Sequence, residues 1–269
     1  MTEHVVDVRT HRVRVLEAGA GQPVLLVHAF PLGAAMWRPQ LEAVPPGWRF
    51  IAPDLHGFGG DRLETPARSM DGHAKDLLAL LDTLGIDRAV VCGLSMGGYV
   101  AFALLRRAPE RVAGLVLCDT RAEADTDEAL DSRRTMRGLL AQRGAGVIAD
   151  LMIPRLLGET TRRERAGVMD TVRGLIEAND PAGIDAAIEA LMSRPDAIPQ
   201  LAAIACPTLI VTGDEDTLTP LAFHQTLREV VPGAHLAVIP GAGHLSNLEQ
   251  PAVFNAVLHQ FLERLARQV

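Results

Sequence analysis

The sequence predicts an α/β fold: a mostly parallel central sheet with helices on both faces and a helical segment inserted after the sixth strand. Short, nearly uninterrupted apolar runs such as PVLLVHAF and AVVCGL are typical of parallel strands buried on both faces. These runs alternate with segments of helical periodicity, which indicates helices packed on a parallel sheet. Hydrophobic residues make up 48% of the 269 residues, enough for a substantial core.

The elements of the first half follow a regular order. Residues 3–17 alternate like two strands, and two buried strands follow in PVLLVHAF and RFIAPDLHGFGG. Leu77, Leu78, Leu81 and Leu84 have the spacing of a helix, and Gly85 is a stop signal at its end. The strand AVVCGL, the helix GGYVAFALLRRAPE and the strand VAGLVLCDT come next.

The strand pattern then stops for about eighty residues. Two stripes at helical spacing occur there, one of Met169, Val172 and Ile176 and one of Ile184, Ile188 and Leu191. Because this segment is too long for a loop in a compact domain, we expect residues 121–205 to form a helical cap. The core is then discontinuous, comprising residues 1–120 and 206–269. It resumes with the strand CPTLIVTGDED, a helix near LAFHQTLREVV, the strand HLAVIPGAGH and a final amphipathic helix.

Charge and cysteine content argue against several classes of function. The net charge is −7 and the basic residues are scattered or paired with acids, so no nucleic-acid partner is predicted. No apolar run is long enough for a membrane span, and the first fifteen residues alternate like a strand rather than a secretion leader. Cys92, Cys118 and Cys206 form no CxxC pair or Cys/His cluster, so we expect a reduced, cytoplasmic protein without a metal site.

One serine lies between glycines where a strand pattern becomes a helix pattern. Gly93, Ser95 and Gly97 fit G-x-S-x-G in VVCGLSMGGYVAFALL. A nucleophile in a sharp turn brings the residues two before and two after it into contact, and glycine relieves that crowding. The alternative is a serine that only caps the following helix. The position at a strand-to-helix junction favours the nucleophile.

A serine hydroxyl needs a base, and candidates follow the later strands. His244 lies in a glycine-rich loop just after a strand, in VIPGAGHLSNLEQP. Asp214 and Asp216 follow the preceding strand in VTGDEDTLTP. Loops from the carboxyl ends of parallel strands meet at one edge of a sheet, so these side chains are expected to converge on Ser95.

The motifs HAFPLGAAMW, APDLHGFG, GLSMGGYVAF, TGDEDTLTP and GAGH resemble α/β-hydrolases of the short-chain carboxylesterase, cofactor-free haloperoxidase-like and enol-lactonase-like group. The resemblance covers nearly the whole chain and implies the α/β-hydrolase fold. It assigns Ser95 as nucleophile, His244 as base and an acid that orients the imidazole. The family pattern G-x-x-D favours Asp216 over Asp214, and Asp119 is a further alternative. No metal or organic cofactor is implied.

The resemblance also implies an oxyanion hole made by the backbone N–H groups of Phe30 and Met96. Pro31 biases Phe30 towards an extended conformation. The usual His-Gly dipeptide reads His28-Ala29 here, so a positive φ at position 29 would strain the alanine. His28 is expected to be structural.

The expected pocket is closed, mostly apolar and suited to short acyl groups. The side chains expected at its acyl end are those of Phe30, Leu32, Trp37 and Met96. The alternative for Trp37 is that it belongs only to the hydrophobic core. The helical cap is expected to roof the serine with Met152 and Leu156.

The predicted function is hydrolysis of small carboxylic esters by a carboxylesterase-type serine hydrolase through an acyl-enzyme intermediate. Enol-lactone hydrolysis is the nearest alternative, with perhydrolysis as a side activity. A non-enzymatic alternative is a small-molecule receptor on the same fold. The predicted partner is a small ester or lactone, and the protein is expected to be a monomer or a small homo-oligomer.

Overall fold

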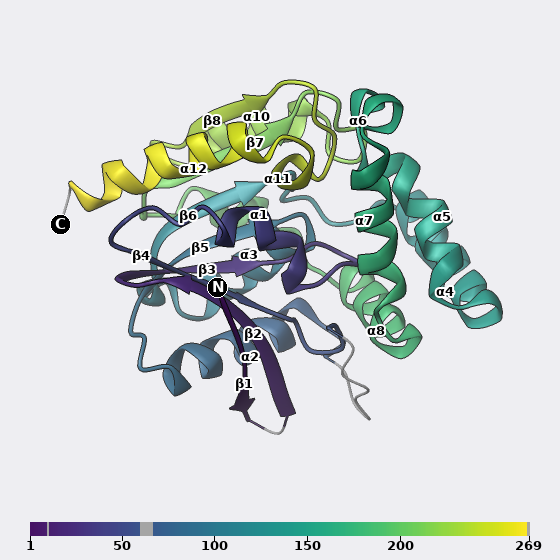
Figure 1. Ribbon diagram of the computed structural model, residues 1–269, viewed down its shortest axis with the longest axis horizontal. Helices are drawn as coiled ribbons and strands as arrows, with labels where there is room; N and C mark the ends of the chain where they lie inside the picture. Colours follow the sequence, from purple (N-terminus) through teal and green to yellow (C-terminus); the bar gives the residue numbers. More distant parts are fainter. Residues whose placement is uncertain (10, 60–66, 268–269) are drawn as a thin grey trace.

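The computed structural model describes residues 1–9, 11–59 and 67–267. Its eight-stranded sheet has the order β1-β2-β4-β3-β5-β6-β7-β8 and runs through the middle of the molecule (Figure 1). Only the β1/β2 and β2/β4 pairs are antiparallel, which confirms the predicted mostly parallel sheet. The strands are β1 (Thr2–Val8), β2 (His11–Gly19), β3 (Gln22–Val27), β4 (Trp48–Pro53), β5 (Ala89–Leu94), β6 (Val112–Cys118), β7 (Thr208–Gly213) and β8 (His235–Ile239).

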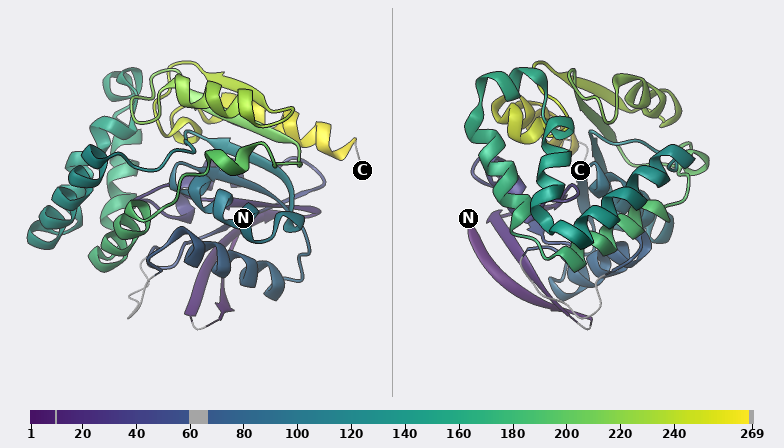
Figure 2. Two further views of the ribbon diagram at one scale, coloured as in Figure 1. Left: turned by 180° about the vertical axis from the view of Figure 1, so that it is seen from behind. Right: turned by 90° about the vertical axis from the view of Figure 1, so that its right-hand side faces the viewer.

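Helices cover both faces of this sheet. One face carries α1 (Arg38–Leu41) and α12 (Pro251–Ala266), with α11 (Ser246–Glu249) between them. The other carries α2 (Met70–Thr83), α3 (Met96–Arg107) and α10 (Leu221–Val230) (Figures 1 and 2). Two short 3₁₀ turns are η1 (Ala34–Trp37) and η2 (Pro109–Arg111). This sandwich explains the apolar runs, because strands covered on both sides bury every side chain.

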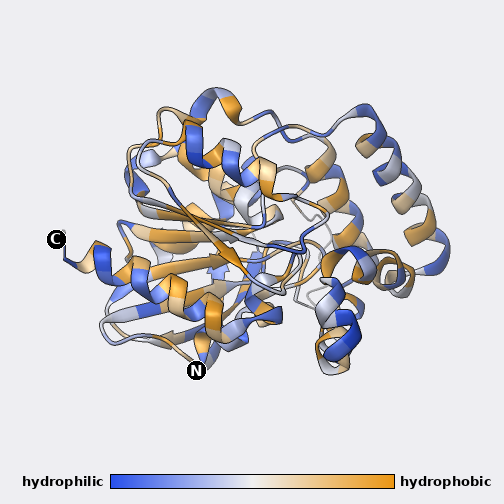
Figure 3. Ribbon diagram, turned by 90° about the horizontal axis from the view of Figure 1, so that it is seen from above, coloured by the Kyte–Doolittle hydropathy of each residue, from blue (hydrophilic) through white to orange (hydrophobic). Residues whose placement is uncertain are grey.

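The middle strands form the centre of the core. Every residue of β5 and β7 is buried. Figure 3 shows the middle of the sheet largely in the hydrophobic colour, between helices of mixed character. The helix α2 begins where Ser69 accepts a hydrogen bond from Gly72 N at 3.1 Å, an N-cap. The predicted stop at Gly85 is confirmed, since that residue has a φ of +67°.

Six helices lie between β6 and β7. They are α4 (Asp127–Arg143), α5 (Ala145–Leu156), α6 (Glu159–Glu164), α7 (Ala166–Glu177), α8 (Pro181–Met192) and α9 (Ile198–Leu201). Figure 1 shows α4 to α8 gathered beyond the carboxyl end of β6. Val172 and Ile176 of α7 are buried, as are Ile184 and Ile188 of α8, so the periodic stripes face the interior. None of the described helices has the length and apolar character of a membrane span.

Candidate active site

Ser95 occupies a strained turn between β5 and α3. Its backbone has φ 54° and ψ −110°, a conformation that non-glycine residues rarely adopt. A Cβ on Gly93 would lie 2.3 Å from the carbonyl oxygen of Gly97, and a Cβ on Gly97 would lie 2.1 Å from that of Val27. Both glycines are therefore required by close backbone approach, as the G-x-S-x-G pattern predicts.

Three side chains form one hydrogen-bonded chain at the carboxyl edge of the sheet. His244 Nε2 lies 2.8 Å from Ser95 Oγ, and His244 Nδ1 lies 2.8 Å from Asp216 Oδ2. Ser95 follows β5, Asp216 follows β7 and His244 follows β8, so each comes from a loop at the same sheet edge. His244 and Asp216 are buried, while Ser95 lines a cavity.

The buried pair of His244 and Asp216 shifts both pKa values. Burial alone would raise the pKa of Asp216, but the charge and hydrogen bond of His244 and the hydroxyl of Thr219 hold it below its ordinary value. Burial alone would lower the pKa of His244, but the charge and hydrogen bond of Asp216 raise it above 6.5. The Asp216 carboxylate thus favours the protonated form of the His244 imidazole.

Four donors fix the Asp216 carboxylate. Oδ1 accepts from Leu218 N at 2.8 Å and Thr219 N at 3.1 Å, and Oδ2 accepts from Thr219 Oγ1 at 2.6 Å as well as from His244. Thr219 Oγ1 also lies 3.3 Å from His244 Nδ1. Thr219 was not predicted from the sequence; its signal is a hydroxyl residue three positions after the acid in a turn.

The other two acidic candidates lie elsewhere. The exposed Asp214 accepts a hydrogen bond from Gly241 N at 2.8 Å and does not contact His244. The buried Asp119 accepts from Gly213 N at 2.9 Å and from Ser246 Oγ at 2.5 Å. Burial, together with the neighbouring charge of Asp216, raises the pKa of Asp119 well above its ordinary value.

Phe30, whose backbone N–H is one of the two predicted oxyanion donors, lies in the loop after β3. Neither Phe30 N nor Met96 N has a hydrogen-bond acceptor among the described residues, and Phe30 lines the cavity at Ser95. Ala29 does not have a positive φ, so the departure from the usual glycine causes no strain there. The Phe30–Pro31 peptide bond is cis. His28 accepts a hydrogen bond from Leu55 N at 2.9 Å, which is a structural contact.

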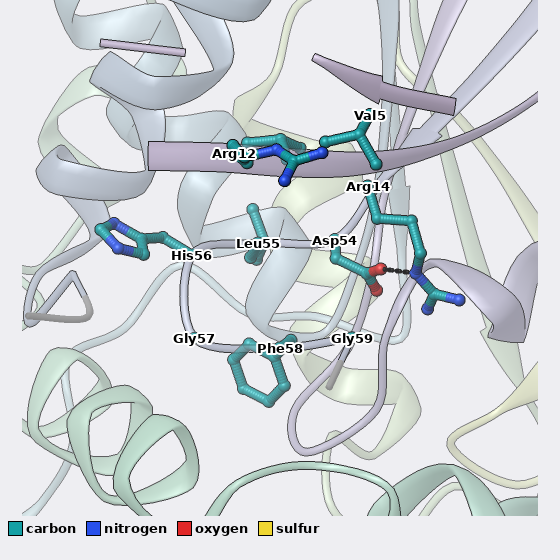
Figure 4. A pocket seen from close by; sticks show the side chains of 10 residues that line it. Val5, Arg12, Arg14, Asp54, Leu55, His56, Gly57, Phe58 and Gly59 are labelled. Carbon is teal, nitrogen blue, oxygen red and sulfur yellow. Dashed lines mark hydrogen bonds and ion pairs between the residues drawn. The ribbon is translucent and has the colours of Figure 1, made fainter. Parts of the chain in front are cut away.

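Asp54 fastens the same loop to the sheet. Its Oδ1 accepts from Ala34 N at 2.7 Å and its Oδ2 from Arg14 Nε at 2.6 Å. Figure 4 shows this ion pair beside the loop 55–59, in a hollow of about 240 Å³ that contains none of the predicted site residues. Asp54 therefore holds the loop after β3 in place without lining the cavity at Ser95.

The cavity at Ser95 has a volume of about 320 Å³ and differs from the mostly apolar pocket that the sequence predicted. Met152 and Leu156 of α5 line it as expected, but Leu32 and Trp37 do not. Trp37 is fully buried and its ring lies 6.1 Å from that of Phe254, which corresponds to the core alternative. Charged side chains also line the cavity: Arg121, Asp125, Glu128, Arg133 and Arg155. Glu128 and Arg133 come from α4, of which only two residues are buried. Arg121 and Asp125 precede that helix, and Arg155 lies on α5.

A group of possible metal ligands lies away from Ser95. Among the residues that the structure describes, His11, His56 and Asp76 place one ligand atom each within 4.8 Å of the others. The two imidazole rings stack at 3.7 Å, and Asp76 also binds Arg9 Nη1 at 3.1 Å. None of these residues lines the Ser95 cavity.

Comparisons with known proteins agree with the geometry. A family model described as the alpha/beta hydrolase fold matches residues 22–251. The chain is 32% identical to the pimeloyl-[acyl-carrier protein] methyl ester esterase of Aromatoleum aromaticum, over 85% of this chain and 93% of the relative. It is 28% identical to 3-oxoadipate enol-lactonase 2 of Acinetobacter baylyi, over 91% and 90%. The malate-bound structure of a thermophilic esterase from Thermogutta terrifontis superimposes with a TM-score of 0.92 at 37% identity, covering 98% of this chain and 99% of that one. The chain is therefore a hydrolase of the α/β-hydrolase fold family.

Proposed function

We propose that this hydrolase cleaves small carboxylic esters by acyl transfer through Ser95. The observation that carries the proposal is the chain of two 2.8 Å hydrogen bonds from Ser95 through His244 to Asp216. A hydroxyl bonded to a buried imidazole, itself oriented by a carboxylate, is the arrangement that activates serine as a nucleophile. The names of an esterase at 37% identity and a methyl ester esterase at 32% identity support the ester class.

The reaction has two halves. Ser95 Oγ forms a bond to the ester carbonyl carbon while His244 Nε2 takes the hydroxyl proton. The N–H groups of Phe30 and Met96 stabilise the negative charge on the carbonyl oxygen. The carbon–oxygen bond to the alcohol then breaks, and the leaving oxygen takes the proton from His244. In the second half a water molecule loses its proton to His244 and attacks the acyl carbon, which releases the acid and restores Ser95.

We infer that residues 121–205 act as a cap that limits substrate size. The cavity of about 320 Å³ is at the lower end of the roughly 300–1,000 Å³ typical of small-molecule pockets. Met152 and Leu156 of the cap line the same cavity as Ser95, so a long acyl chain must displace packed side chains. Among 4-nitrophenyl esters, kcat/KM should peak between acetate and hexanoate and fall at least about tenfold by decanoate.

Ser95→Ala tests the proposal, with Ser132→Ala as its matched control. Ser132 lines the same cavity but has no hydrogen bond to His244. Ser95→Ala should lower turnover of 4-nitrophenyl butyrate by about 10⁴-fold or more. A fluorophosphonate should phosphonylate Ser95 with loss of hydrogen fluoride, so the parent protein and Ser132→Ala should gain the mass of the phosphonyl group at Ser95, whereas Ser95→Ala should not. Retention of a tenth of the activity by Ser95→Ala would exclude the proposed nucleophile.

Enol-lactone hydrolysis is the second candidate. The name of the Acinetobacter baylyi relative favours it, and opening a lactone uses the same acyl transfer with the alcohol retained on the product. Parallel measurement of kcat/KM for simple esters and for an enol-lactone of similar size distinguishes the two substrates.

A further inference from the structure

Several arginine side chains gather at the wall of the Ser95 cavity around one buried carboxylate, that of Asp125. The side chain of Asp125 is fully buried, with Arg121 Nη2 at 2.9 Å and Arg133 Nε at 2.5 Å from its oxygens. Arg194 Nη1 lies 2.8 Å from the same carboxylate. Three guanidinium groups thus surround one negative charge, which leaves two positive charges in excess.

Arg194 has a structural role in this group. Its side chain is 3% exposed, and its guanidinium lies 4.3 Å from the centre of the Tyr99 ring. It also donates to the carbonyl oxygens of Leu191 at 2.9 Å and Glu123 at 3.1 Å. Arg194 does not line the cavity. Burial alone would raise the pKa of Asp125, but Arg133 and Arg194 together hold it below its ordinary value.

Arg121 and Arg133 do line the cavity and keep donors to spare. A guanidinium has five N–H groups, and the contacts with Asp125 use one on Arg121 and two on Arg133. Arg155 of α5 lines the same cavity and has no hydrogen bond or ion pair with any residue that the structure describes. Glu128, which is exposed, is the other carboxylate of the lining. The cavity wall is therefore net positive.

This local charge is opposite in sign to that of the whole chain, which is −7. A concave surface lined by one sign of charge attracts ions of the other sign, since the protein walls screen less than bulk water. Guanidinium groups match the two oxygens of a carboxylate. A purely apolar acyl chain would leave these donors unused.

We propose that the substrate carries a free carboxylate, which binds at Arg121, Arg133 and Arg155 while its ester or lactone carbonyl faces Ser95. This inference rests on the proposed acyl transfer at Ser95 and narrows it to half-esters of short dicarboxylic acids and carboxylated lactones. The arginines bind the substrate and take no part in proton transfer.

The test compares 4-nitrophenyl hydrogen adipate with 4-nitrophenyl hexanoate. Both acyl groups have six carbons and the same leaving group, and they differ in a terminal carboxylate against a methyl group. The ratio of kcat/KM for the two esters is measured in the parent protein, Arg133→Gln, Arg155→Gln and Arg134→Gln. Arg134 is the matched control, because it lies on α4, pairs with Asp131 at 2.5 Å and does not line the cavity. In Arg133→Gln, Asp125 keeps two arginine partners, so no buried charge is left unpaired.

The adipate ester should be preferred about tenfold or more at low salt, and 0.5 M sodium chloride should reduce the preference. Arg133→Gln or Arg155→Gln should lower the ratio about fivefold or more, mainly through KM, while Arg134→Gln leaves it within about twofold. If the parent protein hydrolyses the hexanoate ester well but the ratio of the two kcat/KM values is near one, the proposed carboxylate site is wrong. The proposed esterase activity would not be affected by that result. Equal loss on both esters in Arg133→Gln and Arg155→Gln would also overturn the carboxylate site. No turnover of either ester, with no labelling of Ser95, would instead contradict the proposed function.

Discussion

Replacement of Asp216 by asparagine should destroy catalysis by reversing the direction of one hydrogen bond. In the native site Oδ1 accepts from two backbone N–H groups at 2.8 and 3.1 Å. An asparagine will keep its oxygen at that position, since an amide nitrogen cannot accept from those donors. Its NH₂ group then occupies the place of Oδ2 and faces His244 Nδ1, which lies 2.8 Å from Oδ2 in the native protein.

A donor at that position changes the histidine tautomer. Nδ1 of His244 must then accept, so Nε2 carries the proton and cannot take another from Ser95. The wrong tautomer costs about 10⁴-fold in kcat in serine hydrolases, which corresponds to about 5.5 kcal/mol of barrier at 1.36 kcal/mol per tenfold. We expect a loss of that order in Asp216→Asn.

Asp214→Asn is the matched control, two positions away in the same turn. Its side chain is exposed and accepts a hydrogen bond from Gly241 N at 2.8 Å, which an asparagine oxygen can also accept. Its kcat/KM for 4-nitrophenyl acetate should stay within about twofold of the parent value. The melting temperature of each variant is measured beside its activity. A loss below tenfold in Asp216→Asn, or equal losses in both variants, would refute the proposed role of Asp216.

Three further predictions concern pH and packing. Because Asp216 raises the pKa of His244 above 6.5, kcat/KM should fall as pH drops through a midpoint above 6.5; a midpoint at or below 6.5 contradicts this. Thr219→Val removes the 2.6 Å bond to the carboxylate and should lower the free energy of unfolding by about 1.5–3 kcal/mol in urea titrations, while Thr219→Ser should not. Gly97→Ala places a Cβ 2.1 Å from a backbone oxygen and should reduce turnover at least about 10²-fold. Gly138→Ala has open space around its Cβ and should leave turnover unchanged. Similar activities of the two variants would refute the steric requirement at Gly97.

The fold was predictable because its signals are local. Strands buried on both faces require apolar runs, and the sharp turn at Ser95 requires Gly93, because a Cβ there would meet Gly97 within the same turn. Gly97 belongs to the same motif, although a Cβ there would instead meet Val27 at the end of β3. The choice between Asp214 and Asp216 was harder, since both follow β7 and the sequence offered only a family spacing. In the structure the N–H groups of residues 218 and 219 hold Asp216, and such donors depend on loop geometry rather than residue type.

The interior of the site was less predictable, because it depends on contacts between distant segments. An apolar side chain such as Trp37 fits a core or a pocket equally well, and only its contact with Phe254 decides. Arg121 and Arg133 have the appearance of surface residues in the sequence. Their position on the cavity wall follows from Asp125, a carboxylate whose burial the sequence pattern does not reveal.

The backbone around His244 is held by contacts with residues that are distant in the sequence. Oε1 of the buried Glu249 accepts from Gly243 N at 2.9 Å and Leu245 N at 3.2 Å, the amides on either side of the histidine. Its Oε2 accepts from Gly158 N at 2.8 Å, just beyond the end of α5. The amide of His244 itself donates to the carbonyl oxygen of Leu156 at 3.0 Å. The helical segment that lines the cavity therefore also holds the backbone of His244, so substitutions that move α5 should displace His244 as well as the cavity wall.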